Sequence, residues 1–384
     1  MNNNQIIYLD AAASMPCAHD VITAMMSCSV SNYGNASSNH IMGRRAKIAI
    51  HEATRLLARL INCSMSEITY TAGATESNNL VILGCAEPGS NIIISPIDHK
   101  SILASADEVK TRSIEVRRMK VDSHGRIDIN HLRHLIDSST SLISLSYVNS
   151  EIGTYQNLAN IRSAIANSKA ILHVDASQAL GRLPIDVRKY GIDCASFSAH
   201  KIGGPKGIGA LYTSSRSMHR LRPITFGGAQ SELRSGTLPT PLIVGFGVAA
   251  KLIAEKNLRA AWKSAMLRRR LILNILTQQG IHYQLNSPLT RSTPHILNLS
   301  IPGVRSETLI NCLSSVCISS GSACNTHNLS PSHVITGIGH SKARAECALR
   351  ISYASDIDID ELQVGAERIA STLKLLNNLT REHP

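Results

Sequence analysis

Aromatic residues are scarce in this chain of 384 residues: phenylalanine, tyrosine and tryptophan together make up 3% of it. The core must therefore consist mainly of isoleucine, leucine, valine and alanine, within a hydrophobic content of 43% that is ordinary for a globular protein. Long apolar runs are lacking too, since none reaches the ~18 residues of a membrane-spanning helix. The amino terminus lacks the basic and apolar regions of a signal peptide. We therefore expect no membrane association and a cytoplasmic location.

Paired cysteines are also lacking. The chain has nine cysteines, an odd number, and no two of them show Cys-x-x-Cys spacing. This pattern argues against a disulfide scaffold and predicts that most of the thiols are small buried side chains in a reducing compartment. We predict no metal site.

Acidic residues are outnumbered, with 27 Asp and Glu against 39 Lys and Arg, which gives a formal net charge of +12. Such a charge would suit an acidic partner or nucleic acid. The basic residues are dispersed, however, and the densest group, residues 268–270, falls in a helical pattern that is typical of a solvated face. No zinc-finger spacing or aromatic RNA-binding motif accompanies them. We do not expect direct nucleic-acid binding.

Short apolar runs alternate with amphipathic helical patterns along the first two thirds of the chain. The expected strands are residues 67–71, 91–95, 141–147, 171–175, 194–198 and 209–213, and the expected helices include residues 44–61 and 77–84. This alternation predicts an α/β domain with a mainly parallel central sheet flanked by helices. In such a sheet, ligands bind beyond the carboxyl ends of the strands.

The pattern changes near Ala250. A long helix over residues 248–279 is followed by a strand at 296–301, an amphipathic helix at 306–313, and helices around 332–338 and 360–376. These elements predict a smaller α+β domain at the C-terminal end. We expect the large domain to span residues 15–255, and the small domain to combine residues 1–14 with residues 256–384.

The most informative segment ends a small, polar strand and reads Ser198-Ala199-His200-Lys201 before a glycine-rich run. A lysine fixed at a strand end suits a Schiff base with an aldehyde cofactor. The hydroxyl of Ser198 and the imidazole of His200 would then hold the phosphate of that cofactor. This hypothesis requires three further parts: an acid for a pyridine nitrogen, a phosphate cup and a group that covers the ring.

Two upstream segments are candidates for the cup and the acid. Residues 71–79 lie between a strand and a helix, where backbone N–H groups and the Thr75 hydroxyl can bind an anion. A structural turn with a threonine cap fits that segment equally well. Asp175 ends a buried strand, where a carboxylate is costly unless it meets a protonated pyridine nitrogen, and Gln178 could reach the phenolic oxygen of the ring. A carboxylate that caps the next helix is the alternative.

Three more residues suit the same chemistry. His99 follows the strand at 91–95 and could cover the ring and move protons, although most histidines do neither. Cys324 lies among small polar residues typical of a loop, where a thiol suits sulfur transfer or is an incidental surface cysteine. Arg350 interrupts an apolar strand and needs an acid partner, either a substrate carboxylate or an internal salt bridge.

Taken together, these segments resemble the cysteine desulfurases, pyridoxal-phosphate enzymes of the class V aminotransferase group with the type I fold. The similarity covers nearly the whole chain, and the joint order of its motifs makes it specific. The motifs are residues 8–13, 34–40, 71–79, 149–153, 175–178, 198–201, 234–237 and 319–324, and Arg350. The resemblance implies a homodimer that converts L-cysteine to L-alanine and passes the sulfur, as a persulfide, to an acceptor protein. It also implies a large domain with a mainly parallel seven-stranded sheet and a small domain that carries the cysteine loop.

The resemblance assigns a role to each site residue. Lys201 would carry the pyridoxal phosphate, Asp175 would pair with its ring nitrogen, and Gln178 would contact its phenolic oxygen. His99 would stack on the ring and act with Lys201 in proton transfer. The other implied cofactor contacts are Ala74, Thr75, Asn149, Ser150, Ser198, His200 and, from the other subunit, Thr237.

Substrate recognition is implied in the same way. Arg350 would clamp the cysteine carboxylate with help from Asn149, and the catalytic thiol of Cys324 would take the sulfur. Ser150 departs from the pattern, because the family usually has a second asparagine there, so we expect Asn149 or Ser150 to contact the cofactor differently. The segment at 227–233 is one residue shorter than usual and lacks the usual arginine.

Other functions remain open from the residues alone. A selenocysteine lyase or a class V aminotransferase would share the lysine and the acid, but an aminotransferase needs no loop thiol, so Cys324 counts against it. A non-catalytic scaffold would not need to keep Lys201 and Asp175. The sequence does not specify the sulfur acceptor: iron–sulfur assembly, tRNA thiolation and DNA phosphorothioation are all candidates.

Overall fold

The computed structural model describes residues 5–228, 231–321 and 331–382. Its largest sheet has seven strands in the order β2-β8-β7-β6-β5-β3-β4. These strands are β2 (Ile68–Thr71), β3 (Asn91–Ile94), β4 (Glu115–Arg118), β5 (Thr140–Ser146), β6 (Ile171–Asp175), β7 (Cys194–Ser198) and β8 (Gly209–Thr213). All neighbours from β4 to β7 are parallel, and β8 is antiparallel to both β7 and β2. The prediction of an α/β fold with a mainly parallel sheet is confirmed.

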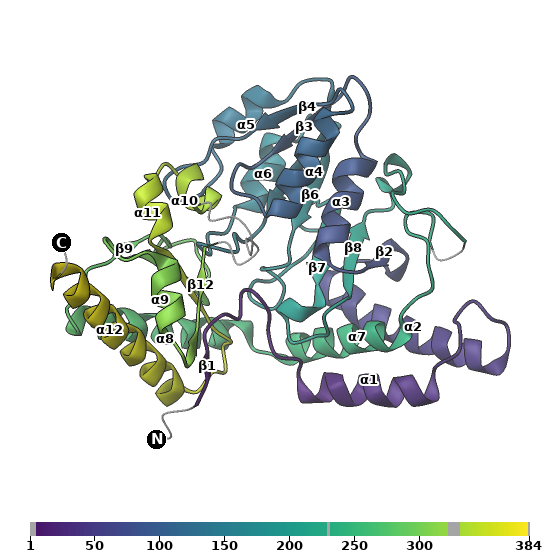
Figure 1. Cartoon of the computed structure of the whole chain (residues 1–384). Coiled ribbons are helices and arrows are strands. Elements are labelled where there is room, and N and C mark those ends of the chain that lie inside the picture. Colours follow the sequence, from purple (N-terminus) through teal and green to yellow (C-terminus); the bar gives the residue numbers. More distant parts are fainter. Residues whose placement is uncertain (1–4, 229–230, 322–330, 383–384) are drawn as a thin grey trace.

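Helices cover both faces of this sheet (Figure 1). Successive strand residues point to opposite faces, so that Ile93 of β3 joins one core while Ile92 and Ile94 join the other. The helices are α1 (His19–Ser31), α2 (Ile41–Ile61), α5 (Ile129–Leu135), α6 (Leu158–Ala164) and α7 (Thr240–Glu255) on the first core, and α3 (Ala74–Gly84) and α4 (Lys100–Lys110) on the second. Burial on both faces explains why most strands of this sheet are nearly continuous apolar runs.

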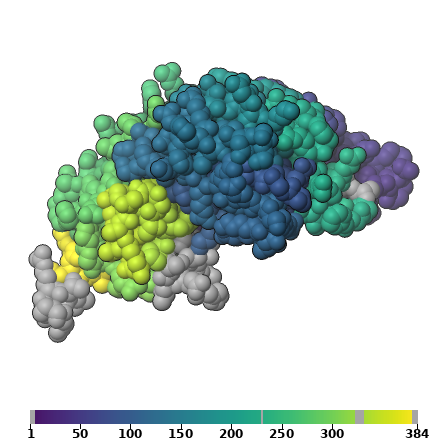
Figure 2. Space-filling model, turned by 90° about the horizontal axis from the view of Figure 1, so that it is seen from above, coloured from purple at the N-terminus to yellow at the C-terminus, as the bar shows by residue number. Residues whose placement is uncertain are grey.

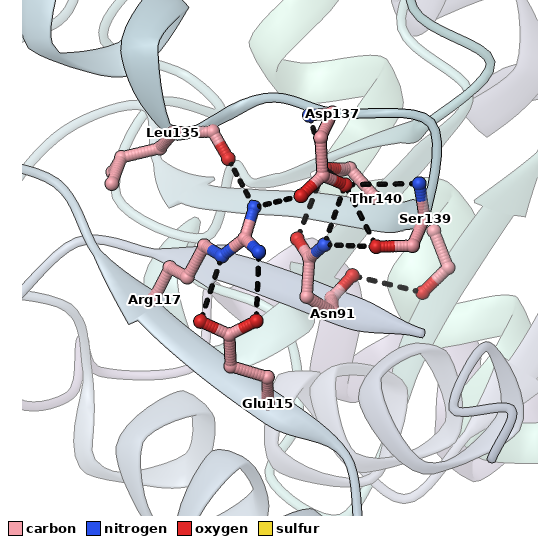
Figure 3. A network of polar contacts seen from close by, with 8 residues as sticks. Asn91, Glu115, Arg117, Leu135, Asp137, Ser139 and Thr140 are labelled. Carbon is pink, nitrogen blue, oxygen red and sulfur yellow. Dashed lines mark hydrogen bonds and ion pairs between the residues drawn. The ribbon is translucent and has the colours of Figure 1, made fainter. Parts of the chain in front are cut away.

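The edge strand β4 was not among the predicted strands, because three of its four residues are charged. Arg117 of β4 bonds to Glu115 in the same strand and to Asp137, which lies beyond α5 (Figure 3). Asp137 also accepts a hydrogen bond from Asn91 at the start of β3. A polar network therefore supports an edge strand that apolar patterning does not reveal.

A second, smaller unit forms at the other side of the molecule (Figure 1). Its four-stranded antiparallel sheet has the order β12-β13-β10-β9 and consists of β9 (Gln284–Leu285), β10 (Ile296–Ser300), β12 (Ser319–Ser320) and β13 (Ala348–Ser352). A parallel pair joins β1 (Ile7–Tyr8) from the start of the chain to β11 (Val316–Cys317). The helices of this unit are α8 (Leu258–Gln278), α9 (Ser306–Cys312), α10 (His333–Gly337), α11 (Lys342–Glu346) and α12 (Ile359–Glu382). The limits that we predicted for the two domains remain a prediction.

The single long helix expected over residues 248–279 is wrong. The chain forms α7 and α8 instead, because Lys256 adopts an extended conformation with ψ of 137°. Asn257 then caps α8 by accepting a hydrogen bond from the backbone N–H of Ala260. Asparagine at this position competes with continued helix by offering its side chain as an N-cap.

The two units meet where α10 packs on the large sheet. Val334 and Ile335 of α10 share a buried apolar cluster with Ile97 and Ile152, which follow β3 and β5. In the space-filling view, the yellow-green part of the chain lies directly against the blue part (Figure 2). Within the described ranges, none of the helices combines the length and apolar character that a membrane span requires.

Candidate active site

A cavity of about 920 Å³ opens beyond the carboxyl ends of the large sheet and extends to the small one. Its walls include eleven of the residues predicted for the site: Ala74, Thr75, His99, Asn149, Ser150, Asp175, Gln178, Ser198, His200, Lys201 and Arg350. Thr237 is exposed and is not among the residues that line the cavity. Cys324 lies outside the described residues. The fold thus brings together residues that are up to 276 positions apart in the sequence, from Ala74 to Arg350.

Lys201 reaches the cavity from the short 3-10 turn Ala199–Lys201 that follows β7. Its Nζ donates hydrogen bonds to the carbonyl oxygens of Ala12, at 2.7 Å, and Ala13, at 2.8 Å. The Nε2 of Gln178 donates to the same Ala12 carbonyl at 2.7 Å. The start of the chain therefore folds back over the large sheet and fixes the lysine at the cavity.

Gln178 is oriented by a residue that the sequence did not indicate. Arg182 donates to the Oε1 of Gln178 at 2.9 Å and to its backbone oxygen. Because a guanidinium group can only donate, the amide oxygen of Gln178 must face Arg182 and its NH₂ group must face Ala12. Burial lowers the pKa of Arg182 to about 10, which leaves it charged at neutral pH.

The carboxylate of Asp175 is buried at the end of β6. From the sequence we expected this buried carboxylate to lack a hydrogen-bond partner within the chain, but it has several. It accepts hydrogen bonds from the backbone N–H and the hydroxyl of Ser177 and from the Nδ2 of Asn78, at 2.6 to 3.0 Å. These donors are neutral, so they solvate the carboxylate without cancelling its charge. Asp175 therefore stays available to a cationic partner in the cavity.

Asn78 also connects Asp175 to His99. Its Nδ2 lies 2.8 Å from the hydroxyl of Ser101, and that hydroxyl lies 2.8 Å from the Nδ1 of His99. The backbone N–H of Ser101 donates to the same Nδ1, so the neutral ring carries its proton on Nε2. Asn78 lies inside the motif at residues 71–79 and Ser101 lies two residues after His99, but nothing in their spacing predicts the connection.

The phosphate cup predicted around Thr75 is placed at the start of α3, an eleven-residue helix. Backbone N–H groups at a helix start attract anions, and Ser198 and His200 line the same cavity as Ala74 and Thr75. Burial, with Lys201 and Lys206 nearby, lowers the pKa of His200 to about 4. His200 is therefore neutral at pH 7 and can donate a hydrogen bond to a phosphate oxygen.

Arg350 extends from β13 into the cavity and is 4% exposed. It forms an ion pair with Asp10 at 2.8 Å and donates to the carbonyl oxygen of Ser150 at 3.1 Å and to the hydroxyl of Ser319. The internal salt bridge that we considered as the alternative therefore exists. Yet the buried Nε of Arg350 has no hydrogen-bond partner among the described residues, so its internal contacts do not use every donor of the guanidinium group.

Asn149 uses its side chain within its own loop. Its Nδ2 donates to the carbonyl oxygen of Ile97 at 2.8 Å, and its Oδ1 accepts from the backbone N–H groups of Glu151 and Ile152. These contacts shape the turn that presents the carbonyl of Ser150 to Arg350. Whether Asn149 and Ser150 contact a cofactor or substrate stays a prediction.

The donor set fits a phosphorylated pyridine aldehyde. One cavity offers an amine at Lys201, a carboxylate at Asp175 and an anion cup at the start of α3, and its volume lies within the range of small-molecule sites. In the part of the chain that the structure describes, no group of three or more histidine, cysteine or acidic side chains is placed to hold a metal ion.

Comparison with known proteins decides the family. The Aminotransferase class-V family profile matches residues 7–364. The chain belongs to this family. The cysteine desulfurase IscS of Neisseria gonorrhoeae is 37% identical to it over 380 residues, which cover 97% of the chain and 94% of the relative.

Solved structures agree with this assignment. A NifS-like protein superposes with a TM-score of 0.89 at 31% identity and covers 97% of this chain and 100% of its own. SspA in complex with cysteine superposes with a TM-score of 0.81 at 34% identity, over 91% of this chain and 99% of that chain. The predicted resemblance to cysteine desulfurases is confirmed, and pyridoxal phosphate is the cofactor of this family.

Proposed function

We propose that this chain is a cysteine desulfurase, which converts L-cysteine to L-alanine and holds the removed sulfur as a persulfide. The observation that carries the proposal is that Lys201 and Arg350 line the same cavity. The first suits covalent attachment of an aldehyde cofactor, and the second suits the carboxylate of an amino acid. The curated relative is named a cysteine desulfurase, and a similar structure holds cysteine.

Pyridoxal phosphate, when bound, supplies an electron sink for the α-carbon of the amino acid. Asp175 would hold the ring nitrogen, Gln178 the phenolic oxygen, and Ser198, His200 and the start of α3 the phosphate. Arg350 would orient the substrate carboxylate through its guanidinium group. Lys201 would take the α-proton, and His99, fixed through Ser101, would exchange protons with the substrate.

The sulfur step requires a thiolate, and we assign it to Cys324. The thiolate attacks the substrate sulfur, the carbon–sulfur bond breaks with its electron pair left on carbon, and a proton completes the methyl group of alanine. In sum, L-cysteine and the Cys324 thiol give L-alanine and a Cys324 persulfide. Gly321 and His333, on either side of residues 322–330, both line the cavity, which supports this assignment.

We infer that the active unit is a homodimer. Ile22, Met26 and Val30 recur at every fourth position along α1 and are 43%, 66% and 80% exposed. Ile41 and Ile48 of α2 are also exposed. An apolar stripe of this kind suits a second copy of the chain, and Thr237, outside the cavity of its own chain, would serve the site of the partner. Sedimentation of the Val30→Asp variant, expected to shift toward monomer, tests this inference.

We further propose a cytoplasmic location and a sulfur-acceptor protein. The eight described cysteines are all free thiols, as a reducing compartment requires. Isotopic labelling of the persulfide, followed by capture of the proteins that receive the label, would identify the acceptor.

The decisive test compares Cys324→Ala with Cys312→Ala, since Cys312 is an exposed cysteine outside the cavity. Both variants should keep the absorbance of bound pyridoxal phosphate. Only Cys324→Ala should reduce alanine formation from cysteine to background, and unimpaired turnover in it would defeat the assignment. Parallel assays with selenocysteine, or with an added keto acid, separate a desulfurase from a selenocysteine lyase and an aminotransferase.

A further inference from the structure

Glu151 is a carboxyl group in the same cavity that the proposed mechanism leaves without a role. It is 4% exposed and lies in the turn that the Asn149 side chain shapes. Burying a carboxyl group costs free energy, so a buried glutamate that serves neither cofactor nor substrate calls for another explanation. Its contacts supply one.

The Oε2 of Glu151 accepts a hydrogen bond from the hydroxyl of Ser332. The same Oε2 also lies against Gly321, where an added Cβ would come within 2.4 Å of Oε2 and 3.1 Å of the Ser332 Cβ. The 2.4 Å distance is far below any van der Waals contact, so a side chain at residue 321 would displace the carboxyl group from this position. Gly321 and Ser332 stand on the two sides of residues 322–330. One carboxyl group thus contacts the chain both before and after that segment.

The Ser332 side of this contact is firmly anchored. The Ser332 hydroxyl also caps α10, by accepting from the backbone N–H of Ile335 at 3.2 Å. The Nε2 of His333 lies 2.9 Å from the carbonyl oxygen of Asp98, on the large-sheet side of the cavity. Val334 and Ile335 are buried against Ile97 and Ile152. A hydrogen bond from Ser332 to Glu151 therefore connects a rigid helix start to the wall of the cavity.

We propose that Glu151 is a positioning residue for sulfur transfer, because its carboxyl group contacts the chain at Gly321 and at Ser332, on the two sides of the segment that contains Cys324. The inference rests on the proposed function, since it assigns Glu151 to the sulfur step rather than to cofactor or cysteine binding. Misplacing reacting groups by about 1 Å can slow a reaction about 100-fold. Loss of this contact should therefore slow persulfide formation and leave the earlier steps intact.

The test uses the holoenzyme and two readouts. In Glu151→Ala, the spectral change of the bound cofactor on titration with L-cysteine should keep its midpoint within about twofold, while single-turnover loading of Cys324, followed by mass spectrometry, slows about 10- to 100-fold. Glu151→Gln retains an acceptor for the Ser332 hydroxyl and should stay within about threefold of the wild type. A Glu151→Gln variant as slow as Glu151→Ala would overturn the proposal, because charge rather than contact would then matter.

Two matched variants exclude a mere loss of folding. Ser332→Ala removes the contact and a helix cap, whereas Ser341→Ala removes only the equivalent cap of α11. Ser332→Ala should slow loading and Ser341→Ala should not. Gly321→Ala should also slow loading, but its effect should be smaller in the Glu151→Ala background, where the 2.4 Å clash with Oε2 is gone and only the 3.1 Å approach to the Ser332 Cβ remains.

The two hypotheses fail in different ways. Wild-type protein that forms no alanine from cysteine overturns the proposed function. Wild-type protein that turns over, with a Glu151→Ala variant that loads Cys324 at the wild-type rate, overturns the positioning role alone.

Discussion

On one wall of the cavity, Asp175 ends strand β6 and Lys201 follows strand β7 of the large sheet. Neutral donors hold Asp175, and two backbone carbonyl oxygens hold Lys201. On the opposite wall, Arg350 leaves the middle of a small-sheet strand and is held by Asp10 and by the carbonyl of Ser150, which are 340 and 200 positions away in the chain. The side chains of the first wall are positioned by the strands of one sheet. The Arg350 side chain of the second wall is positioned by contacts with residues far away in the sequence, which form only when the whole chain has folded. We therefore expect substitutions on the large-sheet wall to abolish chemistry, and those on the small-sheet wall to change recognition or sulfur transfer.

The largest effect should come from Lys201→Ala on the large-sheet wall. Loss of both the attachment point and the proton carrier should lower alanine formation at least ~10³-fold, since general acid–base catalysis alone contributes about 10²–10⁴-fold. Borohydride treatment should no longer fix the cofactor to the protein, as mass spectrometry would show. Lys110→Ala, on the exposed end of α4, is the control and should behave as the wild type. Persistent covalent cofactor in Lys201→Ala would place the amine elsewhere.

Arg350→Ala tests the opposite wall and should affect recognition. Charge-assisted hydrogen bonds contribute about 1.5–3 kcal/mol, so the KM for cysteine should rise about 10- to 100-fold while cofactor absorbance is kept. Arg344→Ala is the matched control, because Arg344 also lies in the small unit and bonds to Asn286, but does not line the cavity. A lower kcat at unchanged KM would show that Arg350 acts in the reaction steps rather than in cysteine binding. The two walls would then not differ in function as we expect.

The sequence predicted the large-sheet wall better than the small-sheet wall, and the reason is physical. Strands buried on both faces are apolar runs, so β6 and β7 were predicted with their observed bounds, and the residues that follow them could be assigned to the cavity. The edge strand β4 escaped prediction because it is stabilised by Arg117 and Asp137, a pairing that depends on tertiary contact. The break before α8 was not predicted, because the hydrophobic pattern typical of a helix continues through Lys256 over residues 248–279.

Pairings across the fold could not be predicted at all. The sequence indicated that Arg350 needs an acid, but not that Asp10 supplies one. It indicated Asp175 and His99, but not the side chains of Asn78 and Ser101 between them. The sequence did not indicate a role for Glu151, because that role depends on contacts with Gly321 and Ser332, which are 170 or more positions away in the chain.

A smaller effect concerns how the stability of the protein depends on pH. Burial raises the pKa of Glu151 from 4.5 to about 7, against the opposing influence of Ser332, Arg350, Lys100 and His99. Between these two pH values the folded chain keeps a proton that the unfolded chain releases, so the free energy of unfolding falls as pH rises. Glu151→Gln removes this penalty, and its Tm should exceed that of the wild type by about 2–4 °C at pH 8 but by little at pH 5.

Scanning calorimetry at both pH values measures this difference directly. Asp98, whose pKa burial also raises to about 7, is present in both proteins, so its contribution cancels in the comparison. A Tm difference that is the same at pH 5 and pH 8 would mean that Glu151 titrates as an exposed glutamate does.

The smallest effect tests the junction between the two units. If α7 and α8 were one helix, Asn257→Ala would stabilise the protein, because alanine has the higher helix propensity. Since Asn257 instead caps α8 through the backbone N–H of Ala260, its loss should cost about 1 kcal/mol and lower the Tm by about 1 °C. Asn257→Asp keeps a capping oxygen and should have the wild-type Tm. A higher Tm in Asn257→Ala would favour a continuous helix, and the two units would then have no boundary at residue 257.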